Sequence, residues 1–283
     1  MRTLLLLAAA ATLSAATVKS DGARVHYRSY GSGRQAVVFI HGWTCNLGFW
    51  DGQAPVYEKR RSLLVDLPGH GASDKPVADY TGERFARAVE AVLRKERVAK
   101  AILVGHSMGV TVTAAFLRLY PERVAGVVIV DGSVPQPLRD PAERAKRREA
   151  GEATSKVYRG ADYRAAATKA IDSMFVAATT AELRDRIRAE MLATPQHVMA
   201  SAREGMTRFS LDLAEEPRSQ APALALMAKR PGVDRTEYKE YLQRVFPNLR
   251  GFQEWEGAGH FLMMEQPERF NAALEAFLSV IPR

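Results

Sequence analysis

A serine flanked by glycines is the feature of this 283-residue sequence that most clearly suggests chemistry. The pentapeptide Gly-His-Ser-Met-Gly at 105–109 follows an apolar run at 101–104 and precedes a helical segment that ends before Pro121. A Gly-x-Ser-x-Gly motif at a strand-to-helix turn exposes the serine hydroxyl, because the glycines leave room for a sharp turn. We therefore expect Ser107 to be the nucleophile of an acyl-transfer reaction.

A serine nucleophile needs a neighbouring base, which is usually a histidine. His260 has the most suitable surroundings, because it lies in a Gly-Ala-Gly-His loop between a predicted strand at 252–255 and a predicted helix at 267–279. His106 adjoins Ser107 in sequence but must point away from it across the turn. We expect packing or structural roles for the remaining histidines, which are His26, His41, His70 and His197.

Acyl transfer also needs hydrogen-bond donors for the oxyanion that develops on the attacked carbonyl. We expect one to be the backbone N–H of Met108, at the N-terminus of the helix after the motif, where the helix dipole favours negative charge. The second is expected from the His-Gly-Trp segment at 41–43, and we assign it to the N–H of Trp43. Gly42 gives that turn the freedom it requires.

Short apolar runs alternate with amphipathic segments along most of the chain. The runs at 36–40, 62–66, 101–104, 126–130 and 223–227 have few polar residues, which is typical of strands buried on both faces. Helices are predicted at 82–94, 108–120 and 267–279. This alternation predicts an α/β fold with a mostly parallel, doubly wound sheet, whose ligands bind beyond the carboxyl ends of the strands.

The alternation stops between residues 133 and 218, where Ala, Arg, Glu and Met dominate and strand formers are few. Helices are predicted there at 141–150, 162–178, 181–193 and 195–209. Because strands resume at 223, we predict a core of residues 17–132 and 219–283 with a helical cap at 133–218. The cap methionines are expected to pack the cap, with some of them lining an apolar pocket.

Four segments in order carry a resemblance to a known family: Phe-Ile-His-Gly-Trp at 39–43, Asp-Leu-Pro-Gly-His-Gly-Ala-Ser at 66–73, the serine motif, and Gly-Ala-Gly-His-Phe at 257–261. Over about residues 25–277 the chain resembles the α/β-hydrolase superfamily, in particular its esterases and lipases with a helical cap. The resemblance implies an eight-stranded-type sheet, a serine–acid–histidine triad in that order, and a lid after the sixth strand. Relatives with an aspartate nucleophile are disfavoured because residue 107 is Ser.

The acid of that triad has two candidates. The commonest arrangement in the family places it after the penultimate strand, where Pro231 occupies the usual region and Asp234 is the nearest carboxylate. Asp131 directly follows the run at 126–130, at a position that some members use, and its alternative role is to order the loop. We favour Asp131 and keep Asp234 as the alternative.

The first 16 residues have the layout of a secretory signal peptide, with Arg2, an apolar run at 4–13 and small residues at 14–16. The run is shorter than the roughly 20 residues that a membrane-spanning helix needs. We therefore expect cleavage near Ala16, no stable membrane insertion, and a secreted or periplasmic protein.

The formal charge of +8 comes from 40 Lys and Arg residues against 32 Asp and Glu residues. The basic segments at 59–61 and 139–148 accompany no nucleic-acid-binding motif, and glutamates interrupt the second, so we interpret them as solvated faces. The single cysteine, Cys45, and the lack of ligand spacings in the sequence argue against a metal site. We expect a small-molecule substrate and no cofactor.

The expected activity is hydrolysis of a small, apolar carboxylic ester through an acyl-enzyme on Ser107, with His260 as general base and Asp131 as its partner. Carbon–carbon bond hydrolysis, lactone hydrolysis, aminopeptidase action and perhydrolysis use the same groups and stay open as alternatives. A catalytically silent ligand-binding protein of the same fold is the alternative from a different class.

Overall fold

The computed structural model describes residues 14–282, so residues 1–13 of the predicted signal peptide lie outside the described part of the chain. Its core is an eight-stranded sheet in the order β1-β2-β4-β3-β5-β6-β7-β8. β2 runs antiparallel to β1 and β4, whereas the other neighbouring strands are parallel. The predicted fold class, a mostly parallel α/β sheet, is confirmed.

The elements have the following bounds. The strands are β1 (Ser14–Ser20), β2 (Ala23–Tyr30), β3 (Gln35–Ile40), β4 (Ser62–Val65), β5 (Lys100–His106), β6 (Val124–Val130), β7 (Ala223–Ala228) and β8 (Leu249–Trp255). The helices of the core are η1 (Leu47–Gln53), α1 (Ala54–Tyr57), α2 (Gly82–Lys95), α3 (Met108–Leu119), η2 (Pro121–Arg123), α8 (Thr236–Val245), α9 (Leu262–Glu265) and α10 (Pro267–Ser279). Between β6 and β7 lie α4 (Pro141–Arg159), α5 (Tyr163–Asp172), α6 (Ala181–Leu192) and α7 (Gln196–Asp212).

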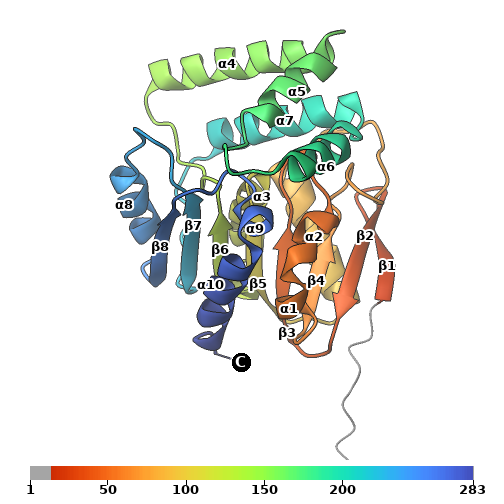
Figure 1. Ribbon diagram of the computed structural model, residues 1–283, viewed down its shortest axis with the longest axis vertical. Coiled ribbons are helices and arrows are strands. Elements are labelled where there is room, and N and C mark those ends of the chain that lie inside the picture. The colour runs from red at the N-terminus through yellow and green to blue at the C-terminus, as the bar shows by residue number, and fades with distance from the viewer. Residues whose placement is uncertain (1–13, 283) are drawn as a thin grey trace, which may run out of the picture.

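Helices cover both faces of the sheet. α1 and α10 pack on one face, and α2 and α3 pack against each other on the opposite face (Figure 1). The residues of the inner strands β4 and β7 are buried throughout, because both faces of the sheet are covered. The near-continuous apolar runs of the sequence are therefore the inner strands of this sheet.

The chain order of the strands locates a binding crevice. β3 lies between β4 and β5, and the chain leaves β3 towards β4 but leaves β5 towards β6, so the connections after β3 and β5 diverge at this point. Ile40 at the end of β3 pairs with Gly105 near the end of β5, which brings the loops after both strands together. In open parallel sheets, ligands bind outside the carboxyl ends of the strands at such a point.

Helices α4 to α7 lie over the carboxyl ends of the strands (Figure 1). α4 runs to Arg159, well past the predicted end at 150, because Gly151 lets it pass close to α7. A Cβ atom at Gly151 would lie 2.5 Å from Cγ2 of Thr207. α5 ends at Asp172, earlier than predicted. The elements without a predicted counterpart include β1, α8 and the short helices η1, α1, η2 and α9.

Ser14, Ala15 and Ala16, at the end of the predicted signal peptide, pair with β2 as the first residues of β1. Within the described residues, no helix is both long and apolar enough to cross a membrane.

Candidate active site

Ser107 occupies a sharp turn between β5 and α3. Its backbone has φ +53° and ψ −114°, a conformation that is costly for a residue with a side chain. Cβ atoms at Gly105 and Gly109 would overlap backbone oxygens, those of Gly109 and Ile40 respectively. The two glycines of the motif are thus required by close backbone packing, and the turn presents the Ser107 hydroxyl beyond the strand ends.

The hydroxyl of Ser107 belongs to a hydrogen-bonded chain of three side chains. Its Oγ lies 2.8 Å from Nε2 of His260, and Nδ1 of His260 lies 2.6 Å from Oδ2 of Asp131. The Asp131 side chain is 1% exposed and that of His260 is 12% exposed. The structure therefore brings together Ser107, His260 and Asp131, three residues far apart in the sequence.

Asp131 is fixed from several directions. It follows β6 with φ +37°, and its Oδ1 accepts a hydrogen bond of 3.0 Å from the backbone N–H of Ala228. Arg230 reaches Oδ2 from outside at 3.0 Å. Burial alone would raise the pKa of Asp131, but the contacts with His260, Ala228 and Arg230 outweigh burial and hold this pKa below its usual value.

Asp234, the alternative acid, lies elsewhere. Its side chain is exposed, and its Oδ1 accepts hydrogen bonds of 2.8 Å from the N–H and 2.7 Å from the hydroxyl of Thr236, at the start of α8. The loop after β7 contributes Arg230 instead of a carboxylate to the neighbourhood of His260. Nothing in the sequence pattern marked Arg230, since its side chain reaches the site through the fold of that loop.

The loop after β3 passes directly beside the nucleophile. A Cβ atom on Gly42 would lie 2.9 Å from Nδ1 of His106 and 3.2 Å from Cβ of Ser107, so only glycine fits there. Trp43 follows on this loop. Met108 is the first residue of α3, where the backbone N–H has no partner within the helix. Trp43 and Met108, the residues predicted to supply the two N–H donors, thus both line hollows that Ser107 also lines.

His41 shapes this loop as a neutral side chain. Its Nδ1 lies 2.8 Å from the carbonyl of Gly42, and its Nε2 accepts a bond of 3.0 Å from the N–H of Leu67. These partners require the hydrogen on Nδ1. Complete burial lowers the pKa of His41, which keeps the ring uncharged beside the site.

His106 holds the loop that carries His260. Its Nε2 donates to the carbonyl of His260 at 2.8 Å, and burial together with the nearby His260 ring lowers the pKa of His106 to about 3. The ring thus bonds to the backbone of the His260 loop rather than to the Ser107 hydroxyl. The predicted structural roles also fit His26, which contacts Asp66, and His197, which bonds the carbonyl of Lys75.

Glu265 connects the same loop to the cap. Its carboxylate accepts hydrogen bonds from the hydroxyl of Thr179 at 2.6 Å and from the N–H of Gly259, the residue before His260. The N–H of His260 donates to the carbonyl of Met174 at 3.1 Å. Burial raises the pKa of Glu265. The cap therefore helps to position His260, a contribution that the sequence pattern did not indicate.

Trp43 joins the loop after β3 to the cap. Its ring Nε1–H donates to the carbonyl of Met199 in α7 at 3.0 Å, and its ring contacts that of Tyr158 edge-on with centroids 5.2 Å apart. The Arg203 guanidinium lies 5.2 Å from the centroid of the Trp43 ring. The position of the cap and that of the Trp43 backbone are thereby coupled.

Two hollows meet at Ser107. A small cavity of about 40 Å³ lies beneath the cap, and it is lined by Gly42, Trp43, Cys45, His106, Ser107, Met174, Met191, Arg203, Met206, His260 and Phe261. A more open groove of about 690 Å³ extends from Ser107, Met108 and Met206 between the loop after β6 and helix α4. Ser107 therefore borders both hollows.

The model of the Alpha/beta hydrolase family matches residues 37–273. The chain belongs to this family. A relative from Paraburkholderia phymatum, named 2-hydroxy-6-oxononadienedioate/2-hydroxy-6-oxononatrienedioate hydrolase, is 30% identical over 90% of this chain and 91% of its own length. The protein is therefore an α/β-hydrolase enzyme, as the resemblance of its motifs implied.

Solved structures of other hydrolases are similar throughout. A thermophilic esterase from Thermogutta terrifontis is 26% identical with a TM-score of 0.75, and the match covers 94% of this hydrolase and 98% of the esterase. An N-acyl homoserine lactone degrading enzyme is also 26% identical, with a TM-score of 0.72 and coverage of 93% and 100%. Proteins with this fold thus include one named as an esterase and one named as a lactone-degrading enzyme.

Proposed function

We propose that this hydrolase cleaves esters of small carboxylic acids by acyl transfer to Ser107. The observation that carries the proposal is the continuous hydrogen-bonded chain from Ser107 through His260 to Asp131, with distances of 2.8 and 2.6 Å. Serine is a weak nucleophile until a base takes its proton, and Nε2 of His260 lies within hydrogen-bonding distance for that transfer.

The reaction begins when Ser107 Oγ attacks the ester carbonyl and its proton moves to Nε2 of His260. Asp131 accepts the Nδ1–H of His260 and stabilises the imidazolium that forms. The tetrahedral intermediate then expels the alcohol, which takes the proton from Nε2. Water attacks the acyl-enzyme in the same way, with His260 again accepting and returning the proton, and releases the acid.

The negative oxygen of the intermediate needs fixed donors, and we assign this role to the backbone N–H groups of Trp43 and Met108. Met108 begins α3, whose aligned peptide dipoles favour negative charge at that end. The uncharged state of His41 and His106 keeps additional positive charges from opposing the protonation of His260.

The shapes of the two hollows support a small acyl group and a larger alcohol. The cavity of about 40 Å³ has room for a few non-hydrogen atoms beside Met174, Met191 and Phe261, whereas the groove of about 690 Å³ could hold a bulkier group. We therefore expect kcat/KM to be highest for p-nitrophenyl acetate to butyrate and to fall at least tenfold by the octanoate.

Stoichiometric labelling by a fluorophosphonate tests the nucleophile independently of the substrate. The native protein should take up one label, and Ser107→Ala should take up none. A folded native protein that stays unlabelled and leaves every p-nitrophenyl ester intact would exclude the proposed activity and favour a silent ligand-binding protein.

Carbon–carbon bond hydrolysis is a second candidate, because the relative that is 30% identical over most of both chains is named for such a substrate. Incubation with 2-hydroxy-6-oxononadienedioate discriminates between the two candidates. A kcat/KM for this compound that exceeds the best p-nitrophenyl ester value would assign the enzyme to carbon–carbon bond cleavage.

We also propose that the enzyme acts outside the cytoplasm, on the support of the signal-like sequence of residues 1–16. Cleavage after Ala16 leaves four residues of β1, from Thr17 to Ser20, paired with β2. N-terminal sequencing of the protein from an exporting host should begin at or close to Thr17, and a chain that retains Met1 would refute export by cleavage.

A further inference from the structure

Arg203 of α7 faces the same small cavity as Ser107 and His260. Its side chain is half-buried, and the guanidinium lies 5.2 Å from the ring centroid of Trp43 and 5.9 Å from that of Tyr158. Aromatic faces hold a guanidinium by cation–π attraction without occupying its N–H groups. Arg203 is thus oriented by two rings at the edge of the proposed reaction centre.

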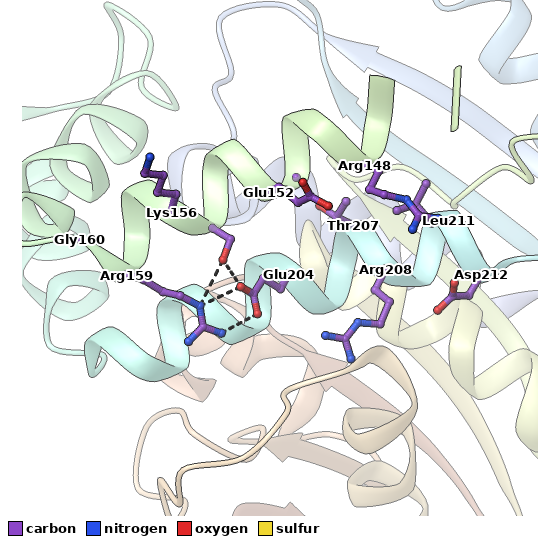
Figure 2. Close-up of a pocket in the computed structure, with 12 residues that line it drawn as sticks. Arg148, Glu152, Lys156, Arg159, Gly160, Glu204, Thr207, Arg208, Leu211 and Asp212 are labelled. Carbon is purple, nitrogen blue, oxygen red and sulfur yellow. Dashed lines mark hydrogen bonds and ion pairs between the residues drawn. The ribbon is translucent and has the colours of Figure 1, made fainter. Parts of the chain in front are cut away.

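Arg203 has no acidic partner in the described part of the chain, unlike Arg159, Arg188 and Arg208 of the cap. Among the described residues, its guanidinium forms neither an ion pair nor a side-chain hydrogen bond. The adjacent Glu204 pairs instead with Arg159 at 2.7 Å, in a separate hollow of about 800 Å³ between α4 and α7 (Figure 2). Arg230 likewise pairs with Asp131.

The surroundings of Arg203 make this lack of a partner informative. Of the described residues that line the small cavity, Arg203 alone has a permanent charge, and its neighbours there include Met174, Met206 and Phe261. Removing a cation from water is costly unless an anion compensates it. Because no side chain within residues 14–282 supplies that anion, the substrate is the natural source of it.

We propose that Arg203 binds a carboxylate of the substrate, a few bonds from the carbonyl that Ser107 attacks. The fork of guanidinium N–H groups can donate two parallel hydrogen bonds to a carboxylate. The cavity volume of about 40 Å³ restricts the connecting chain to a few atoms. This inference rests on the proposed ester hydrolysis and specifies its substrates as monoesters of short dicarboxylic acids.

The experiment compares each acid with its uncharged analogue. Monoethyl malonate, succinate and glutarate are paired with the matching ethyl esters in which a carboxamide replaces the carboxylate, and ethanol release is measured for each. At the best chain length, the native enzyme should prefer the acid in kcat/KM by roughly 10- to 100-fold, the range expected for hydrogen bonds to a charged group.

Two substitutions test Arg203 directly. Arg203→Met should remove most of this preference, and Arg203→Lys should retain part of it, because a lysine keeps the charge but not the planar fork. The ratio of acid to amide is the readout, since loss of stacking on Trp43 lowers both rates alike. Arg208→Met is the matched control: Arg208 is on the same helix, is exposed, pairs with Asp79, and should leave the ratio unchanged.

An acid-to-amide ratio near or below one in the native enzyme, or an equal ratio in Arg203→Met, would overturn the role of Arg203. If the fluorophosphonate still labels Ser107 and p-nitrophenyl acetate is still cleaved in that case, the proposed ester hydrolysis stands without this specificity. Absence of labelling and of all ester cleavage would refute the proposed function itself.

Discussion

Replacing Asp131 with asparagine tests the proposed triad most directly, because the two oxygens of Asp131 have different duties. Oδ1 accepts from the N–H of Ala228, and Oδ2 faces Nδ1 of His260. Asparagine has a single acceptor oxygen. If that oxygen stays with the buried N–H of Ala228, the NH₂ group faces Nδ1, the ring proton moves to Nε2, and His260 can no longer accept the proton of Ser107.

The size of the loss follows from the lost charge and the altered tautomer. A carboxylate and an imidazolium whose charge centres are about 4 Å apart attract by about 4 kcal/mol at an effective dielectric constant of 20. At 1.36 kcal/mol per tenfold change in rate, this energy corresponds to about 10³-fold. With the unfavourable tautomer added, we expect kcat to fall by about 10⁴-fold, the scale known for a triad aspartate.

The assay is kcat for p-nitrophenyl acetate, with the unfolding temperature measured alongside. Asp234→Asn is the matched control, because Asp234 is exposed and contacts Thr236 rather than His260; its activity should stay within about twofold of the native value. A decrease in kcat of less than tenfold in folded Asp131→Asn would refute the assignment of Asp131. A decrease in Asp234→Asn that exceeds the decrease in Asp131→Asn would also refute it.

Other consequences concern stability and the cap. Burial lowers the pKa of His70 and of His106 to about 3, against about 6.5 in the unfolded chain, so unfolding takes up protons and the free energy of unfolding falls as pH drops below 6.5. Urea titrations should show a free energy of unfolding that is lower by about 2 kcal/mol per histidine at pH 5 than at pH 7.5. Equal values at the two pH values would contradict this. Trp43→Phe removes the bond to Met199 and should cost about 1 kcal/mol in the same titration, with a lower kcat for p-nitrophenyl acetate; an unchanged protein would show that this bond does not hold the cap. Glu265→Gln leaves one acceptor oxygen for two donors, so it should lower the free energy of unfolding by about 1–3 kcal/mol and reduce kcat severalfold. A variant with native values of both quantities would contradict this.

The sequence was sufficient for features that depend on local backbone geometry. Gly105 and Gly109 mark the turn at Ser107 because any side chain there would overlap the backbone. The apolar runs mark the inner strands because both faces of the sheet are buried. The family model and the similar structures confirm the fold that these patterns predict.

Other features depend on how distant segments pack, and the sequence left them open. The sequence favours Asp131 but does not exclude Asp234, because both follow a parallel strand and their separation depends on the fold of the loop after β7. Arg203 lies in an ordinary helical pattern, and Glu265 lies just before the predicted helix at 267–279. Nothing local indicates that Arg203 faces a cavity or that Glu265 accepts hydrogen bonds from Thr179 and from the His260 loop. α4 exceeds its predicted length because Gly151 is accommodated by its contact with α7.

The double attachment of Trp43 constrains how this enzyme can be adapted to new substrates. Its backbone N–H is a proposed oxyanion donor while its ring bonds to α7, so mutations that shift α7 to enlarge the cavity should also disturb the neighbourhood of Ser107. α4 borders the open groove and buries only Tyr158 among its described residues. Directed evolution towards bulkier alcohols should therefore succeed more readily with libraries on α4 than with libraries on α7.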